Sequence, residues 1–141
     1  MDTEEIRVYL QTALDHLELA KHAYHISRYD DVVLHCSYAA ENASSALLLN
    51  AGIKPSKRHE NWYVLQKYYL PTLVERDEKI QRVINFLREI VPHLKERARY
   101  PPILEGRRVT PKEYYTKSIA DYYLEEAEYI VKLVKELLVK L

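Results

Sequence analysis

Two arginine–histidine pairs have a spacing that suits metal-free cleavage of RNA. Four residues separate Arg88 from His93, and six separate Arg28 from His35. Such cleavage needs a proton acceptor or donor near the 2′-hydroxyl and a cation near the scissile phosphate. On an uninterrupted helix Arg88 and His93 would point about 140° apart, although a kink at Pro92 could change that angle. These four residues are the catalytic candidates, but with 6 His and 21 basic residues a chance match is the favoured explanation.

Two basic segments could instead hold a phosphate-bearing ligand, because arginine clamps phosphate and tyrosine stacks on a base. One segment is 54–59, and the other begins at 97 and continues to the basic pair at 107–108. The alternative is that these are solvated loop charges, balanced nearby by Glu96 and Glu105. The predicted ligand contacts are Lys57, Arg58, His59, Arg97, Arg99 and Tyr100.

Glu41 stands among small apolar residues, where a carboxylate must be paired or exposed. A structural ion pair or an interface contact is favoured over catalysis. No Cys, His or carboxylate spacing predicts a metal site, and no glycine-rich loop predicts a nucleotide cradle. We therefore expect no cofactor. The single cysteine, Cys36, is expected to be a buried apolar residue rather than a nucleophile.

The elements that must position these side chains are all helical by pattern. Apolar residues recur at spacings of three and four along four segments, which are 3–26, a second segment that ends near Asn50, 71–97 and 110–141. A shorter helix is expected over 59–69. Asp30 or Asp31 is the expected cap of the second helix, and Gly52 its left-handed end. Pro92 is expected to kink or interrupt the fourth helix. Residues 98–111 read as irregular, and no strand is expected. The sequence therefore predicts an all-α antiparallel bundle of four to five helices, forming a single domain over 1–141.

The composition limits the classes of function. Lys plus Arg number 21, as do Asp plus Glu, so the chain lacks the excess positive charge of a protein that binds nucleic acid non-specifically. The start of the chain is acidic where a signal peptide is basic, and no apolar run is long enough to span a membrane. We expect a cytoplasmic protein. The abundance of Lys, Glu, Arg and Tyr hints at a thermophile.

The order of several short motifs resembles the HEPN (higher eukaryotes and prokaryotes nucleotide-binding) family. The Tyr-Asp turn at 28–31 leads into Tyr38-Ala39-Ala40-Glu41-Asn42, His59 opens the next helix, and Arg99-Tyr100-Pro101 follows the long fourth helix. The ribonuclease branch of that family carries a motif of the form Arg-x4-6-His, placed about where residues 97–100 lie here. In this sequence no His follows Arg97 or Arg99. Asn42 and Ser45 stand where members often carry lysines.

The resemblance implies a homodimer and leaves three functions open. The first is a non-catalytic nucleotide- or RNA-binding module, often paired in this family with a small nucleotidyltransferase. The second is a metal-independent ribonuclease of the toxin type. The third is a structural or interaction protein without a ligand. Whether the chain is an enzyme stays open at this point, with the first function favoured.

Overall fold

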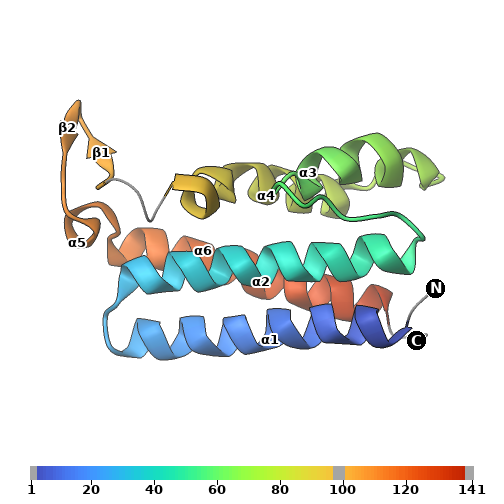
Figure 1. Cartoon of the computed structure of the whole chain (residues 1–141), viewed down its shortest axis with the longest axis horizontal. Coiled ribbons are helices and arrows are strands. Elements are labelled where there is room, and N and C mark those ends of the chain that lie inside the picture. Colours follow the sequence, from blue (N-terminus) through green and yellow to red (C-terminus); the bar gives the residue numbers. More distant parts are fainter. Residues whose placement is uncertain (1–2, 97–100, 139–141) are drawn as a thin grey trace.

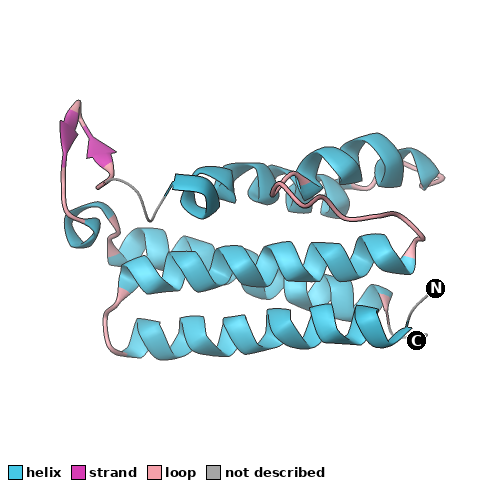
Figure 2. Cartoon of the chain, viewed as in Figure 1, coloured by secondary structure: helices cyan, strands magenta, loops and turns pink. Residues whose placement is uncertain are grey.

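Four long helices make up the body of the protein. The computed structural model describes residues 3–96 and 101–138, and its long helices are α1 (Thr3–His25), α2 (Tyr29–Asn50), α4 (Glu78–Glu96) and α6 (Lys117–Leu137). They run lengthwise, and α1, α2 and α6 pack together. Helix α4 lies on the opposite side of α2 from α1 (Figure 1). Helix dominates the chain (Figure 2), which confirms the predicted all-α bundle.

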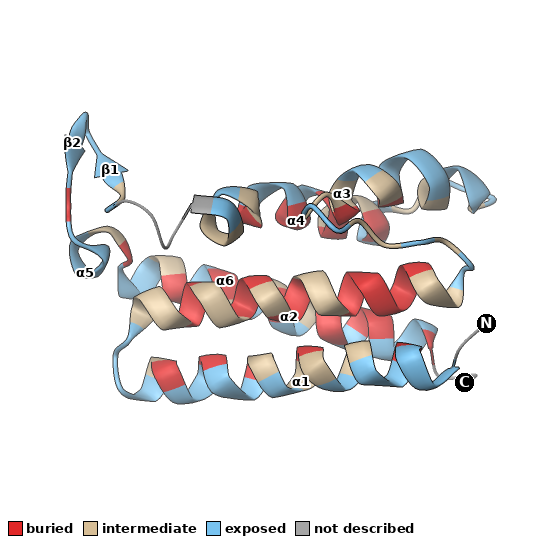
Figure 3. Ribbon diagram, in the orientation of Figure 1, coloured by how far each residue is buried: buried red, intermediate tan, exposed pale blue. Residues whose placement is uncertain are grey.

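The small residues of α2 explain its central position. Side chains of alanine and serine along this helix are fully or almost fully buried, and α2 contacts α1, α6 and α4. Small side chains let neighbouring helices approach closely. Figure 3 shows the buried residues continuing along α2. The buried small residues of α2 are Cys36, Ser37, Ala39, Ala40, Ala43, Ser44, Ser45 and Ala46.

The two ends of α2 are built differently. At its start Tyr29 is the first helical residue, and Arg28 occupies the cap position without a capping hydrogen bond from its side chain, so the predicted cap at Asp30 or Asp31 is wrong. Both carboxylates lie in the first turn, where negative charge suits the helix dipole. At its end Gly52 has φ +75°, and the following amide donates to the carbonyl of Leu48 at 2.9 Å. This left-handed end confirms the predicted role of Gly52.

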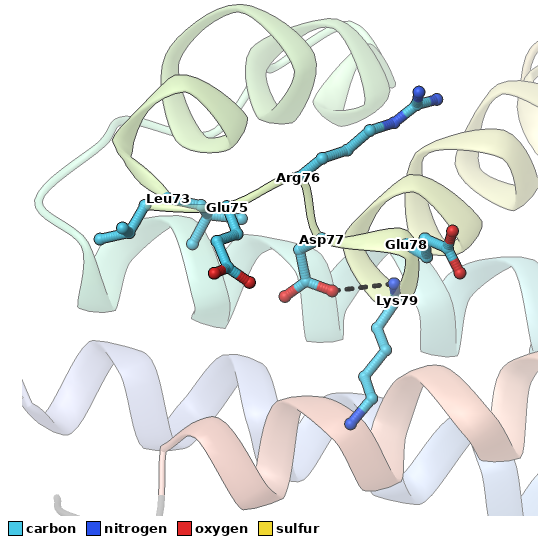
Figure 4. A pocket seen from close by; sticks show the side chains of 7 residues that line it. Leu73, Glu75, Arg76, Asp77, Glu78 and Lys79 are labelled. Atoms are coloured by element: carbon cyan, nitrogen blue, oxygen red, sulfur yellow. Dashed lines mark hydrogen bonds between the residues drawn. The ribbon is translucent and has the colours of Figure 1, made fainter.

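The segment between α2 and α4 departs from the prediction. The short α3 (Asn61–Val64) continues into a π turn, η1 (Leu65–Tyr69), and a 3-10 turn, η2 (Leu70–Thr72). Leu73 is then extended, so the helix predicted to begin at Pro71 begins instead at Glu78. Asp77 provides its cap, because the carboxylate accepts from the amide of Lys79 at 2.8 Å (Figure 4). Pro92 does not interrupt α4, which runs to Glu96.

The segment between α4 and α6 contains two elements that the sequence pattern did not predict. Strands β1 (Ile103–Leu104) and β2 (Arg107–Arg108) form an antiparallel hairpin, turned by Glu105 and Gly106 at positive φ. The predicted cap at Thr110 is confirmed, since Thr110 and Glu113 form a reciprocal capping box. That helix, α5 (Pro111–Tyr114), ends at once, and Thr116 caps α6 separately. The last helix is therefore two helices rather than one.

Candidate functional site

Glu41 and His59 form a carboxylate–imidazole pair on one side of α2. The Nδ1 atom of His59 lies 2.6 Å from Oε1 of Glu41. A carboxylate only accepts hydrogen bonds at neutral pH, so Nδ1 carries the proton and Nε2 is the basic nitrogen of the neutral ring. The side chain of His59 is 34% exposed and that of Glu41 is 17% exposed. The pair therefore presents an oriented imidazole to solvent while its carboxylate lies deeper.

The backbone of His59 is held in an uncommon conformation. Its φ is +62°, a left-handed value that costs energy for residues other than glycine. The hydroxyl of Ser56 accepts from the amides of Arg58 at 3.0 Å and Glu60 at 3.2 Å, which closes the loop on either side of His59. The loop is thus built to hold this imidazole against Glu41.

Asn61 ties the loop to α2 from within. It is 2% exposed, and its amide nitrogen lies 2.9 Å from the hydroxyl of Ser44 and 3.0 Å from that of Ser45. Its carbonyl oxygen accepts from the backbone amide of Ser56 at 2.9 Å. The polar side chains of α2 that face this loop are therefore satisfied, and they fix its position.

Exposed cations precede His59 in the same loop. Lys57 and Arg58 are exposed in the same loop, and Lys95 near the end of α4 pairs with Glu60 at 3.9 Å. We call Glu41, Lys57, Arg58 and His59 the loop site. It joins the predicted structural carboxylate to one predicted ligand contact, His59, and includes the two preceding residues, Lys57 and Arg58. The favoured interpretation of Glu41 as an ion-pair partner agrees with this geometry.

The two arginine–histidine pairs have other partners. The guanidinium of Arg88 lies 5.2 Å from the ring centre of Trp62, whereas Nδ1 of His93 lies 2.9 Å from the hydroxyl of Tyr115. Arg88 therefore faces α3, and His93 faces the start of the C-terminal helices.

The second pair is separated in the same way. Arg28 pairs with Asp30 and Asp31 in the α1–α2 turn, at 3.4 and 3.5 Å. The Nδ1 atom of His35 lies 3.1 Å from Nδ1 of His16 on α1. Each histidine thus contacts a different element from its arginine.

Three predicted ligand contacts, Arg97, Arg99 and Tyr100, lie outside the described residues. Within residues 3–96 and 101–138, no three His, Cys, Asp or Glu side chains come together as a metal site. Among the described helices none combines the length and the apolarity that crossing a membrane requires. A hollow beside α4, lined by residues 73–79, opens broadly to solvent and includes Glu75, Arg76 and Asp77 (Figure 4).

The residues that sequence reasoning missed are those that support His59. Ser44, Ser45, Ser56 and Asn61 carry no recognisable motif. The only signal was the presence of adjacent serines on an otherwise apolar helix, which calls for a polar partner from another element.

Comparison with known proteins places the chain in a family. A model described as "HEPN domain" matches residues 6–137. A relative from Methanocaldococcus jannaschii named "Putative toxin MJ1304" is 29% identical over 135 residues, covering 94% of this chain and 87% of the relative. The crystal structure of ST0689, an archaeal HEPN homologue, superposes with a TM-score of 0.69 at 24% identity, covering 97% of this chain and 98% of that one. At that identity the superposition shows a shared fold. The match to the family model extends over most of the chain, and this protein belongs to the HEPN domain family.

Proposed function

We propose that this protein is a non-catalytic HEPN module that binds a nucleotide or RNA at the loop site. Membership of the family supports a nucleotide- or RNA-related function. The observation that carries the proposal is the 2.6 Å bond between His59 and Glu41, next to the exposed Lys57 and Arg58. Strained backbone conformations are concentrated at functional sites, so the left-handed conformation of His59 supports a ligand-binding role for its imidazole.

The chemistry of the loop site suits a phosphate group with an attached base or sugar. Lys57 and Arg58 supply cations that form charge-assisted hydrogen bonds with phosphate oxygens. The contact with Glu41 orients the His59 ring, so that its Nε2 edge is available to the same ligand. Binding should therefore strengthen at low ionic strength and weaken with added salt.

A binding measurement on three variants tests this proposal. Calorimetric titration with ATP and with a short single-stranded RNA should give binding to the wild-type chain. Arg58→Ala and His59→Ala should each weaken it about tenfold or more, as expected for a lost hydrogen bond to a charged group. The matched control is Lys132→Ala with Lys135→Ala, which removes two exposed cations from α6. Equal affinity of all variants would remove the loop site from consideration.

A metal-independent ribonuclease is the second candidate. It is favoured by the name of the toxin relative and by the oriented basic nitrogen of His59. In such a reaction the 2′-oxygen attacks phosphorus and gives its proton to a base, while the 5′-oxygen leaves with a proton from an acid. Cleavage of RNA in EDTA, abolished by His59→Ala but not by Lys132→Ala, would support an enzyme. If cleavage is instead lost in His93→Ala or His35→Ala, the activity belongs to the arginine–histidine pairs predicted from their spacing.

The remaining expectations concern partners and the residues outside the described part. Arg97, Arg99 and Tyr100 remain proposed ligand contacts: Arg99→Ala should lower nucleotide affinity and leave the melting temperature unchanged. A homodimer and a nucleotidyltransferase partner also remain proposals. Sedimentation of the chain alone and with the product of a neighbouring transferase gene tests both. If no nucleotide or RNA binds and none is cleaved, an interaction protein without a ligand is the remaining function.

A further inference from the structure

A groove at one end of the bundle contains none of the residues of the loop site. It has a volume of about 710 Å³ and lies between the α1–α2 turn and the segment that runs from Thr110 to Lys117. In Figure 1 this is the end where α1 finishes, α2 and α6 begin, and α5 packs beside them. We call it the end groove.

The charged residues of the end groove are mostly cations. Arg28, Lys112 and Lys117 line it, and Asp30 is the one carboxylate among its described lining residues. Arg28 contacts Asp30 at 3.4 and 3.5 Å and Asp31 at 3.5 Å. Because all three contacts are long, its guanidinium can turn toward a stronger acceptor. Lys117 is the first residue of α6, where a cation opposes the helix dipole and a bound anion would relieve that conflict.

Two tyrosines give the same groove a fixed aromatic wall. Tyr115 is only 6% exposed, and its hydroxyl lies 2.9 Å from Nδ1 of His93, which holds the ring in place. Tyr29 is half-buried and packs edge-on against Tyr24, with ring centres 5.9 Å apart. Rings held by other contacts lose little entropy when an organic group packs on them.

We propose that the end groove is a second binding site, which takes a phosphate group carried on a nucleoside or other flat organic moiety. Arg28, Lys112 and Lys117 contact the phosphate oxygens, and Tyr29 and Tyr115 contact the organic part. The phosphate belongs either to a free nucleotide or to the end of an RNA strand. This site goes beyond the proposed function, and it does not require a ligand at the loop site.

Isothermal titration with four probes tests the proposal and separates the sources. The probes are inorganic phosphate, AMP, and one RNA hexamer with and without a 5′-phosphate. We expect AMP to bind more tightly than inorganic phosphate, because only AMP reaches the tyrosines. Tighter binding of the phosphorylated hexamer than of AMP would identify an RNA end, and the reverse would identify a free nucleotide.

The decisive variant is Lys112→Ala with Lys117→Ala. Both lysines are exposed, so the fold should persist, and the melting temperature without ligand checks this. The affinity for AMP should fall about tenfold or more, the effect of roughly 1.4 kcal/mol. Lys132→Ala with Lys135→Ala removes the same charge near the far end of α6 and should leave the affinity unchanged. Asp30→Asn should strengthen binding, because the anion then meets one carboxylate fewer.

Independent variants separate the end groove from the loop site. His59→Ala should leave AMP binding in the end groove unchanged, so a second binding event remains when the first is lost. If the Lys112/Lys117 variant binds all four probes as the wild type does, the proposal is overturned. It is also overturned if Asp30→Asn weakens binding of these anionic probes, since a carboxylate in the groove should oppose them, or if no probe binds at millimolar concentration.

Discussion

The imidazoles of His16 and His35 meet across the α1–α2 contact, with their Nδ1 atoms 3.1 Å apart. A bond between two Nδ1 atoms needs a proton on one and a lone pair on the other. At most one Nδ1 of the pair can therefore carry a proton while the bond is intact. Tyr38 packs against His16 from α2, and Asp15 lies next to it on α1.

This relationship predicts a loss of stability as the pH falls. Burial first, and then the charge of His35, lowers the pKa of His16 below its usual 6.5. The unfolded chain therefore takes up a proton at a higher pH than the folded chain does, and stability falls with pH from about 6.5 down to the lowered folded pKa. Above that window the contribution is fully present.

The difference between wild type and His16→Gln isolates this contribution. Melting temperatures of both should be followed from pH 8 to pH 5. We expect the wild type to lose more than the variant through the window below about pH 6.5. Parallel curves would show that His16 is not the group responsible. His22→Gln, an exposed histidine of α1, is the control that should leave the wild-type slope unchanged.

Overfilling the centre of α2 should destabilise the fold. Ala43 is fully buried where α2 packs between its neighbours, so Ala43→Leu forces extra methyl groups into a filled space. We expect a loss of about 1–3 kcal/mol in the free energy of unfolding. The control Ala51→Leu adds the same atoms at an exposed position after α2 and should cost much less. Denaturant unfolding measures both, and equal costs would contradict close packing at Ala43.

Local chemistry explains which parts of this fold could be predicted. Gly52 and the Thr110–Glu113 box each rest on neighbours within a few residues, so the sequence pattern was sufficient for them. The start of α4 was misplaced because Pro71 suits the first turn of either an α-helix or a 3-10 turn, and the extended Leu73 decides between them. Nothing in the hydrophobic period distinguishes these alternatives.

In the candidate site, too, only the part that rests on neighbouring residues could be predicted from the sequence. Glu41 was expected to be paired or exposed because it stands among small apolar residues. That its partner is His59 depends on a loop folding back along α2, with Asn61 meeting Ser44 and Ser45. Arg88 and His93 match the spacing of a catalytic pair, for which a chance match was the favoured explanation. In the structure they contact Trp62 and Tyr115, on different elements.

The contact between α4 and α6 depends on a fork geometry that lysine cannot reproduce. Arg82 donates to both carboxylate oxygens of Glu126, at 3.0 and 2.9 Å, and its guanidinium lies 3.8 Å from the ring centre of Tyr129. Arg82→Lys keeps the charge but loses the two-point contact and the stacking, and should cost about 0.5–1 kcal/mol. A double-mutant cycle with Glu126→Gln measures the coupling. An Arg82→Lys protein as stable as the wild type would show that charge alone matters here.

Asn61 should be the most sensitive of the polar residues that support the loop site. Its side chain bonds to the hydroxyls of Ser44 and Ser45, which are buried, and to the amide of Ser56, which is half-buried. Asn61→Ala takes a partner from the Ser45 hydroxyl and from the Ser56 amide, and each group left unpaired costs roughly 1–3 kcal/mol. We expect a total loss of about 2–4 kcal/mol in the free energy of unfolding, because the loop can relax and rehydrate in part.

A milder variant distinguishes the network from simple loss of volume. Ser44→Ala removes one acceptor for Asn61 together with a hydroxyl that bonds to the carbonyl of Glu41 at 2.6 Å, so fewer groups are left unpaired. Its cost should be about 1 kcal/mol. Hydrogen exchange supplies the local readout: the amides of Arg58 and Glu60 should exchange faster in Asn61→Ala, because the loop that holds His59 has lost its anchor to α2. Unchanged protection at both amides would mean that Ser56 alone maintains the loop, and Asn61 would then have no part in orienting His59.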